Sequence, residues 1–183
     1  MKTKFLMLFK LLFLLIYIVF FNGISCSAQE SSKFSENNQH NIFLEFCGNS
    51  FFIYNITYDF SFQIAKKQKI AVGLGGQYSP SGINMLFRPS VTGIYPQINY
   101  LYGENNAYLE VGTGYTFFWF YPGGVELSQF VPLRIGYRYQ KDNGGLFWKI
   151  AFVTFWGDQI WWDGYKVTPW GGVAFGYTFK KRE

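Results

Sequence analysis

Four segments of the chain end in the same five-residue pattern, in which an apolar residue, a tyrosine and an aromatic residue alternate with variable positions. The segments cover residues 56–60, 98–102, 135–139 and 175–179, and their tyrosines lie 42, 37 and 40 residues apart. A near-constant period of this length indicates a repeated supersecondary unit. The alternation of apolar and other residues within each segment is the period of a β-strand. The repeat therefore predicts a β-structure built from four similar units.

Each repeat is expected to pair with a second strand, so that the chain forms four hairpins. The expected partner strands lie around residues 44–47, 70–73, 109–112 and 148–151. Short polar connections at 63–68, 103–105 and 141–144 alternate with longer ones at 79–91, 120–129 and 157–167, and only the link at 48–50 interrupts this rhythm. Short turns at one end and long loops at the other are typical of an outer-membrane barrel. An even number of strands then places both termini at the short-turn, periplasmic end.

The side chains of the expected strands fall into one bulky apolar face and one small, polar or charged face. In the segment 131–140, for example, Leu133, Ile135 and Tyr137 alternate with Arg134 and Arg138. An eight-stranded barrel has an interior only just wide enough for side chains, so the bulky face is expected to point outward into lipid. A backbone surrounded by lipid must close on itself. The sequence thus predicts an all-β fold: an eight-stranded antiparallel up-and-down transmembrane β-barrel over residues 41–180.

Three prolines interrupt the expected strands at Pro96, Pro132 and Pro169. Proline donates no hydrogen bond to a β-ladder and is therefore confined to edges, strand starts and bulges. We interpret all three as features of the long-loop rim, where strand pairing ends.

The first 28 residues have the layout of a cleavable secretory signal helix, with a positive start, an apolar run from 11 to 21 and small residues before Ala28. Cleavage after Ala28 is expected, and lipidation of Cys26 is the alternative. Residues 29–40 form a polar leader, and residues 181–183 form a short charged tail. Without residues 1–28 the chain carries 13 basic and 11 acidic residues, so no nucleic-acid partner is indicated.

The strand-end pattern, the signal segment and the closing residues 170–179 (WGGVAFGYTF) resemble the small outer-membrane β-barrel proteins of Bacteroidota. The architecture is similar to the eight-stranded barrels of OmpA and OmpX type. This resemblance implies location in a bacterial outer membrane, contact with outer-membrane lipid and insertion by the barrel-assembly machinery. It departs from the usual pattern because Lys180 to Glu183 follow the final aromatic residue. The resemblance supplies no catalytic residue, and no cofactor or metal is expected.

Six charged residues are expected to face the lumen and form one network. They are Glu45, Asp59, Glu110, Arg134, Arg138 and Lys149. One interpretation is a gated or narrow ion path. The other is a structural plug of salt bridges, which is favoured because eight strands leave no room for a water channel and buried charges require partners.

Aromatic residues in the long connections have two interpretations, an interfacial girdle or a surface that binds sugar or lipid. The loop candidates for binding are Phe120, Tyr121, Trp161, Trp162 and Tyr165. The only histidine is His40, in the leader, so no His–Ser–acid set is available at the outer rim and no enzyme is expected. The expected role is structural or one of surface interaction through the long loops. A barrel that holds a small apolar ligand or transports narrowly, and a soluble lipocalin-like periplasmic barrel, are the rival interpretations.

Overall fold

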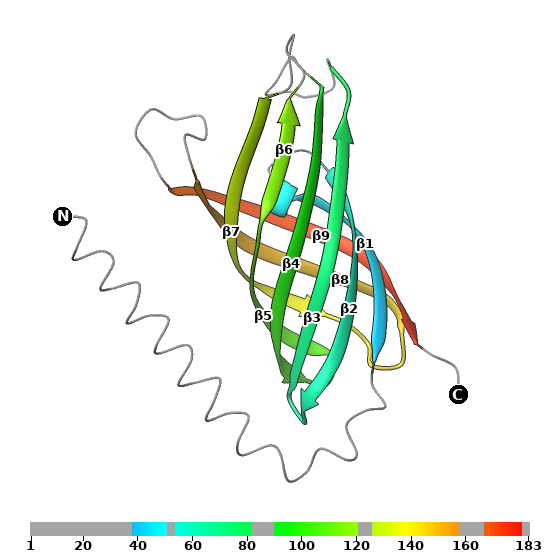
Figure 1. Ribbon diagram of the computed structural model, residues 1–183. Coiled ribbons are helices and arrows are strands. Elements are labelled where there is room, and N and C mark those ends of the chain that lie inside the picture. The colour runs from blue at the N-terminus through cyan, green and yellow to red at the C-terminus, as the bar shows by residue number, and fades with distance from the viewer. Residues whose placement is uncertain (1–37, 51–53, 82–89, 121–125, 158–166, 181–183) are drawn as a thin grey trace, which may run out of the picture. The chain divides into compact units, whose positions relative to one another are not determined.

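The computed structural model describes residues 38–50, 54–81, 90–120, 126–157 and 167–180, so the expected signal segment and most of the polar leader lie outside it (Figure 1). The elements are β1 (Gln39–Cys47), η2 (Gly48–Ser50), β2 (Tyr54–Ala65), β3 (Gln68–Ser79), β4 (Val91–Glu104), β5 (Ala107–Gly114), β6 (Thr116–Phe120), β7 (Glu126–Tyr139), β8 (Gly145–Gly157) and β9 (Val167–Lys180). Among these residues no helix is long and apolar enough to cross a membrane.

The strands form one closed antiparallel barrel. Their order is β3-β2-β1-β9-β8-β7-β5-β4, and pairing of β3 with β4 closes the ring. Strands β5 and β6 both lie between β4 and β7 and continue the same register, so they are two parts of one wall strand. The barrel therefore has eight strands, as the repeat predicted. Chain neighbours are also barrel neighbours, which is the up-and-down topology.

The two ends of the barrel differ in their connections. At one end β4 and β5 join through Asn105 and Asn106, with φ of 56° and 69°, and Glu104 pairs with Ala107 across them. Two central residues with positive φ are the mark of a type I′ hairpin turn, which matches the twist of the flanking strands. At the other end the long connections expected at 79–91 and 157–167 leave the barrel after Ser79 and Gly157.

The third long connection is shorter than expected. Strand β6 runs to Phe120 and β7 begins at Glu126, so the predicted loop at 120–129 shrinks to residues 121–125. Trp119 pairs with Leu127 and Phe117 with Gln129 in this hairpin. The polarity of residues 126–129 alternates only weakly, so the sequence did not predict a strand there. These residues are in a strand because they pair with the strongly aromatic β6.

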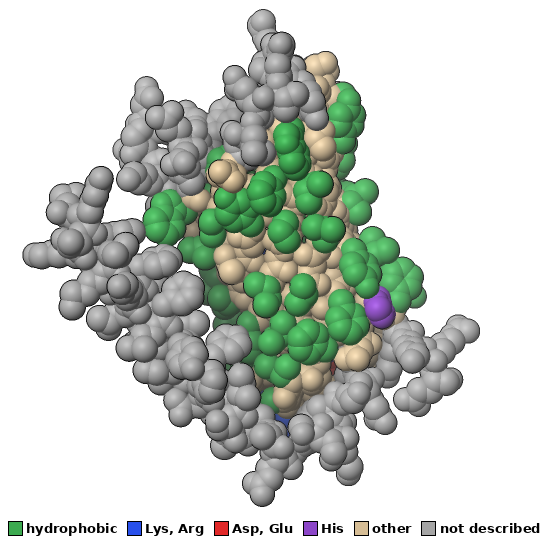
Figure 2. All heavy atoms as spheres, viewed as in Figure 1, with side chains coloured by type: hydrophobic (Ala, Val, Ile, Leu, Met, Phe, Trp, Pro, Cys, Tyr) green, Lys and Arg blue, Asp and Glu red, His purple; other side chains and the backbone are tan. Residues whose placement is uncertain are grey.

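The apolar face of the barrel points outward. Ile135 is 51% exposed and Phe175 58%, whereas Arg138 is 0% exposed and Glu110 1%. Figure 2 shows apolar side chains spread over the visible face of the barrel, with almost no charged groups among the described residues there. This inside-out polarity agrees with the orientation predicted from side-chain size.

Two of the three prolines lie deeper in the sheet than expected, since Pro96 is the sixth of the 14 residues of β4 and Pro132 the seventh of the 14 residues of β7. Pro96 is inside β4, where it pairs with Leu74 of β3. The N–H of Tyr115 donates to the Pro96 oxygen at 3.0 Å, but Pro96 has no N–H with which to complete the pair. The wall strand formed by β5 and β6 has β4 on one side and β7 on the other. The register of β7 places Pro132 opposite Gly114. These two prolines explain why the wall strand divides into β5 and β6 at Tyr115.

The interior is less lean than the size argument predicted. Five phenylalanines lie inside the barrel and are at most 4% exposed: Phe43, Phe118, Phe130, Phe147 and Phe155. Inward glycines make room for the large rings. A Cβ at Gly93 would lie 2.6 Å from Phe118, and one at Gly176 would lie 2.6 Å from Phe147. The interior of an eight-stranded barrel thus accepts large side chains where a neighbouring strand supplies glycine.

Candidate functional site: the charged lumen

The structure brings the six predicted lumen charges together in one network, here called the charged layer. Arg134 contacts Glu45 at 2.5 Å and Glu110 at 3.3 Å. Arg138 contacts Asp59 at 2.9 Å and Glu110 at 3.5 Å. Lys149 contacts Glu110 at 3.4 Å. Three carboxylates therefore meet three cations, and Glu110 contacts all three of the cations.

The central position of Glu110 follows from strand register. In the ladder between β5 and β7, Glu110 pairs with Gly136, which lies midway between Arg134 and Arg138 on the same face of β7. On the other side of β7, Arg138 pairs with Lys149 of β8. Adjacent strands therefore supply the cations and the shared carboxylate. Glu45 of β1 and Asp59 of β2 complete the network from other parts of the wall.

Aromatic rings cover the cations that the carboxylates leave partly free. The Lys149 ammonium lies 4.0 Å from the ring centre of Phe43, and the Arg138 guanidinium carbon lies 4.7 Å from that of Phe147. Cations over ring faces gain about 0.5 to 2 kcal/mol, more when water is excluded. The inward phenylalanines near the charged layer thus contribute to its electrostatic balance as well as filling space.

The charged layer closes the barrel at its middle. All six side chains are at most 4% exposed. A charge taken out of water costs several kcal/mol unless a partner and further hydrogen bonds compensate it. Equal numbers of opposite charges at contact distance supply the partners and leave the layer neutral, although Glu110 Oε2 and the Nε atoms of Arg134 and Arg138 have no hydrogen-bond partner among the residues that the structure describes. Of the two interpretations of these residues, the geometry supports the plug.

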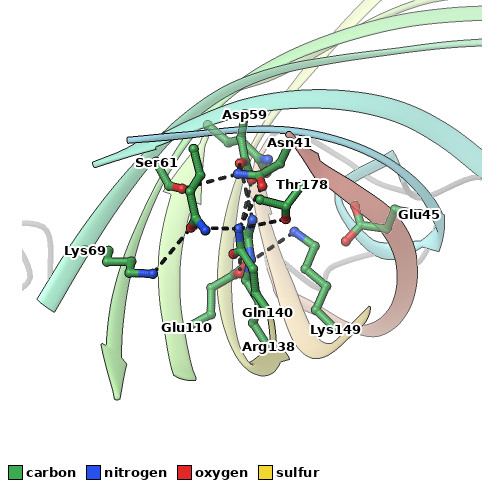
Figure 3. A network of polar contacts seen from close by, with 12 residues as sticks. Asn41, Glu45, Asp59, Ser61, Lys69, Glu110, Arg138, Gln140, Lys149 and Thr178 are labelled. Carbon is green, nitrogen blue, oxygen red and sulfur yellow. Dashed lines mark hydrogen bonds and ion pairs between the residues drawn. The ribbon is translucent and has the colours of Figure 1, made fainter. Parts of the chain in front are cut away.

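A layer of amides and hydroxyls adjoins the charged layer on the side of the short turns (Figure 3). The Gln140 amide donates to Asn41 at 2.7 Å and to Thr178 at 3.0 Å, and the Asn41 amide donates to Asp59 at 2.5 Å. These bonds connect β1, β2 and β9 with Gln140, the residue that follows β7. Strand alternation places these residues inside, but their chemistry gave no signal in the sequence.

The turn between β7 and β8 is fastened across the short-turn end of the lumen, which sequence reasoning missed. Asp142 accepts hydrogen bonds from Lys69 at 2.6 Å and from Tyr108 at 2.8 Å. The Gln39 amide donates to the backbone oxygens of Lys141 and Asp142. These partners are 34 to 103 residues apart in the chain, and no local pattern connects them.

The short helix η2 occupies the lumen on the other side of the charged layer. Its Asn49 is 1% exposed and donates from its side chain to Gln97 at 2.6 Å and from its backbone to Glu45 at 3.3 Å. Thr116 of β6 donates to the Asn49 backbone oxygen at 3.4 Å. The expected link at 48–50 is therefore an internal element rather than a rim connection.

The remaining candidates from the sequence lie mostly outside the described residues. This holds for Tyr121, Trp161, Trp162 and Tyr165, for the cleavage residue Ala28 and for Cys26. Phe120 is the last residue of β6. His40, expected in the leader, lies in β1, and its ring nitrogen is 2.7 Å from the Tyr58 hydroxyl on the outer face.

No protein-family model matches the chain, and no curated protein matches it significantly. Among solved structures it is similar to the N-terminal β-barrel domain of Pseudomonas aeruginosa OprF, with 12% identity, a TM-score of 0.48, and coverage of 80% of this chain and 100% of that one. It is also similar to Ail, the attachment invasion locus protein of Yersinia pestis (11%, TM-score 0.43, 78% and 95%). A third similar structure is Neisserial surface protein A (10%, TM-score 0.44, 79% and 94%).

At these identities and scores the likeness carries no information on function or partners. The assignment of fold rests on the strand pairings and on the burial of the charged layer. On that basis the chain has the architecture of a small eight-stranded outer-membrane β-barrel protein.

Proposed function

We propose that the chain is an integral outer-membrane protein whose barrel is a closed, non-conducting and non-catalytic scaffold. Its function is then carried by the long connections after Ser79, Phe120 and Gly157, which a rigid barrel presents at the outer surface. The observation that carries this proposal is the charged layer, because a lumen blocked by paired charges lets nothing pass through the barrel.

The exterior supports the membrane location. Outward side chains such as Ile56, Leu133 and Phe152 are each more than half exposed. A soluble barrel would lose roughly 25 cal/mol for every Å² of such apolar surface left in water. A lipid surrounding removes that cost, and ring closure satisfies the backbone.

The interior argues against a pore and against catalysis. An ion would have to separate Arg138 from Asp59 and Arg134 from Glu45 at an electrostatic cost that no water offsets. In the described part of the chain, the His40 ring is held against Tyr58 on the outer face of β1. The described buried acids, Glu45, Asp59 and Glu110, face the lumen instead, and each is paired with a cation.

Two experiments test the proposal. Single-channel recording of the refolded protein in planar bilayers is expected to show no conductance steps, and steady ion conduction would contradict the closed lumen.

The surface role is tested in a strain that lacks the gene and is complemented with a variant whose residues 158–166 are replaced by a Gly-Ser linker. We expect this variant to fold but not to restore the surface phenotype that the strain has lost.

A matched control replaces the turn residues Lys66 and Lys67 at the opposite end of the barrel with the same kind of linker. This variant is expected to restore the phenotype fully. Restoration by the 158–166 variant as well would mean that this long connection does not carry the function.

A further inference from the structure

The lumen on the side of the long connections contains an apolar region that differs from the charged layer. Its residues, here called the outer compartment, are Val91, Phe118, Phe130, Val153 and Phe155. Phe118 and Phe130 are in tilted contact at 5.6 Å between ring centres, and Phe130 contacts Phe155 at 6.3 Å. Trp170 of β9 packs against the group. An interior apolar cluster of this kind is more than a closed scaffold requires, since the charged layer already closes the barrel.

One buried amide without a partner borders the outer compartment. Gln77 of β3 pairs with Gly93, and Gly93 in turn pairs with Phe118. A Cβ at Gly93 would lie 3.2 Å from the Gln77 side chain and 2.6 Å from the Phe118 ring, so both side chains lie over this glycine. Gln77 is 7% exposed, and neither its amide nitrogen nor its amide oxygen has a hydrogen-bond partner among the described residues.

An apolar interior bordered by a few polar groups, here Gln77, Thr116 and Ser79, is the usual composition of a small-molecule site. A buried amide that lacks both a donor and an acceptor partner is destabilising, and a ligand that supplies both partners would offset this cost. A primary amide pairs best with a group that donates and accepts at once. A neutral carboxylic acid does so through two parallel hydrogen bonds, and a carboxyl group in a dry, apolar site is held in its neutral form.

The wall beside the outer compartment has a weakened seam at Gly114 and Tyr115. Pro96 faces Tyr115 on one side, and Pro132 faces Gly114 on the other. Neither proline can donate a ladder hydrogen bond, so two successive wall carbonyls receive none from the residues opposite. The next residue along, Thr116, pairs with Phe130 of the outer compartment.

The seam also lies within the lipid-facing belt. On β4 the outward residues on either side of Pro96, Ile94 and Ile98, are 43% and 49% exposed. Missing ladder bonds at lipid depth are costly and mark a point at which the wall separates most easily. The seam therefore lies between the bilayer and the apolar part of the lumen.

We propose that the outer compartment binds one acyl chain with a terminal carboxylic acid, admitted from the outer leaflet through the seam and oriented by the Gln77 amide. The compartment is filled by phenylalanine rings, so the acyl chain enters by displacing the Phe118 ring, which rests on Gly93 without a side chain beneath it. The charged layer below prevents passage to the other side. The barrel holds the fatty acid rather than transporting it.

The test uses the full barrel in lipid nanodiscs and a sixteen-carbon fatty acid that carries a photoreactive diazirine in mid-chain. After illumination, peptide mapping by mass spectrometry is expected to place the label on β6, β7 and β8 at inward residues, with unlabelled palmitic acid as competitor. Labelling confined to outward residues such as Ile94 would show annular lipid only and would overturn the proposal, as would an outcome in which Gln77 binds nothing but water.

Three variants sharpen this test, and each is first checked for heat-modifiable folding. Gln77→Leu is expected to weaken competition by palmitic acid about tenfold and to leave labelling by a diazirine alkane without a carboxyl group unchanged. Phe118→Ala enlarges the compartment and is expected to increase inward labelling. If both variants label like the unmodified protein, the outer compartment is not the site.

The seam has a matched control elsewhere in the barrel. The double variant Pro96→Val, Pro132→Val restores both missing donors and is expected to slow inward labelling about tenfold or more. Pro169→Val makes the same change in β9, where Pro169 pairs with Thr154 of β8 away from the seam, and is expected to have no effect. Equal labelling rates for these variants and the unmodified protein would rule out access through the seam.

Discussion

The two halves of the lumen are filled by opposite chemistry. The charged layer lies at the middle of the barrel and its amides adjoin it toward the short turns, whereas the part toward the long connections contains η2 and the outer compartment of phenylalanine and valine. Both halves are almost completely shielded from solvent. Water is thus excluded from one part of the lumen by paired charges and from the other part by packed aromatic rings.

This difference determines how each half responds to damage. The charged layer depends on partners from β1, β2, β5, β7 and β8, so removing one partner leaves another charge buried without compensation. The outer compartment depends on contact area, so a truncated ring costs the lost contacts and the cavity that remains. We therefore expect a single substitution in the charged layer to cause a large loss of folding stability, and a single substitution in the outer compartment to cause a smaller one.

The largest expected effect is that of Arg138→Ala. It leaves Asp59 and one side of Glu110 without a cation, and we expect the folded barrel to lose about 4 kcal/mol of stability. Urea unfolding in lipid vesicles, followed by heat-modified gel mobility, measures this loss. A loss under about 1 kcal/mol would place Arg138 among ordinary surface charges and contradict the description of the layer.

Removal of both partners separates pairing from packing. Arg138→Met combined with Asp59→Leu replaces a buried ion pair by apolar groups, which is often neutral or stabilising. We expect this double variant to regain most of the stability that Arg138→Ala loses. A double variant as unstable as Arg138→Ala would mean that shape, and not charge, governs this half.

In the outer compartment, Phe118→Ala is expected to cost about 3 kcal/mol, the usual range for a buried phenylalanine. Because Phe118 and Arg138 share no partner among the contacts of the charged layer, the costs of Phe118→Ala and Arg138→Ala should add to within about 0.5 kcal/mol in the double variant. Strong non-additivity in the same urea assay would show that the two halves are coupled through the wall.

Two neighbouring glycines distinguish the inner from the outer face. A Cβ at Gly75 would collide with the Tyr95 ring and with Thr57, whereas a Cβ at Gly76 would meet only the Gly93 oxygen at 3.7 Å. Gly75→Ala is therefore expected to destabilise the barrel by about 2 kcal/mol through overpacking, and Gly76→Ala by less than about 0.5 kcal/mol. Equal midpoints in urea would argue that the inner face has unfilled space beside Tyr95.

The smallest effect is expected outside the barrel wall. Lys67 in a short turn contacts Glu104 at 3.0 Å, and its side chain is 45% exposed. The hydrogen bond that the Lys67 ammonium donates to the Glu104 carboxylate raises the pKa of Lys67 above its ordinary value of 10.5. A raised lysine pKa stabilises the folded state below the ordinary value, and this stabilisation is lost as the pH rises through the raised value.

Lys67→Ala should accordingly leave stability at pH 8 unchanged within error, since exposed pairs contribute little. The only expected difference is that the stability of the Lys67→Ala variant declines slightly less above pH 10 than that of the unmodified protein. A large loss at pH 8 would mean that the turn is part of the structure that closes the lumen.

The sequence allowed the barrel and the charged layer to be predicted because both follow from strict alternation. In β7, the residues Arg134, Gly136 and Arg138 stand between larger apolar residues, so their common inward face is unambiguous. The same alternation in β5 places Glu110 opposite that face. Closure and neighbour order then follow from the chain order of the hairpins.

The outer compartment and η2 were not predictable in this way. In β8, Phe147 and Trp148 are adjacent, as are Phe155 and Trp156, so neither face is recognisably polar. The inward rings fit only because glycines on other strands, such as Gly93 and Gly176, lie beneath them. The position of Asn49 depends on Gln97, 48 residues away, and the division at Tyr115 on two prolines in different strands.

The central claim is the sidedness of the wall, and site-directed spin labelling tests it most directly. In a background without the two native cysteines (Cys26→Ser, Cys47→Ser), single cysteines replace Phe175, which is 58% exposed, and its neighbour Ala174, which is fully buried. We predict that a label at position 175 collides freely with lipid-dissolved oxygen, and that a label at 174 is immobile and inaccessible to oxygen and to polar relaxation agents alike. Lipid accessibility at 174 together with polar accessibility at 175 would contradict the account.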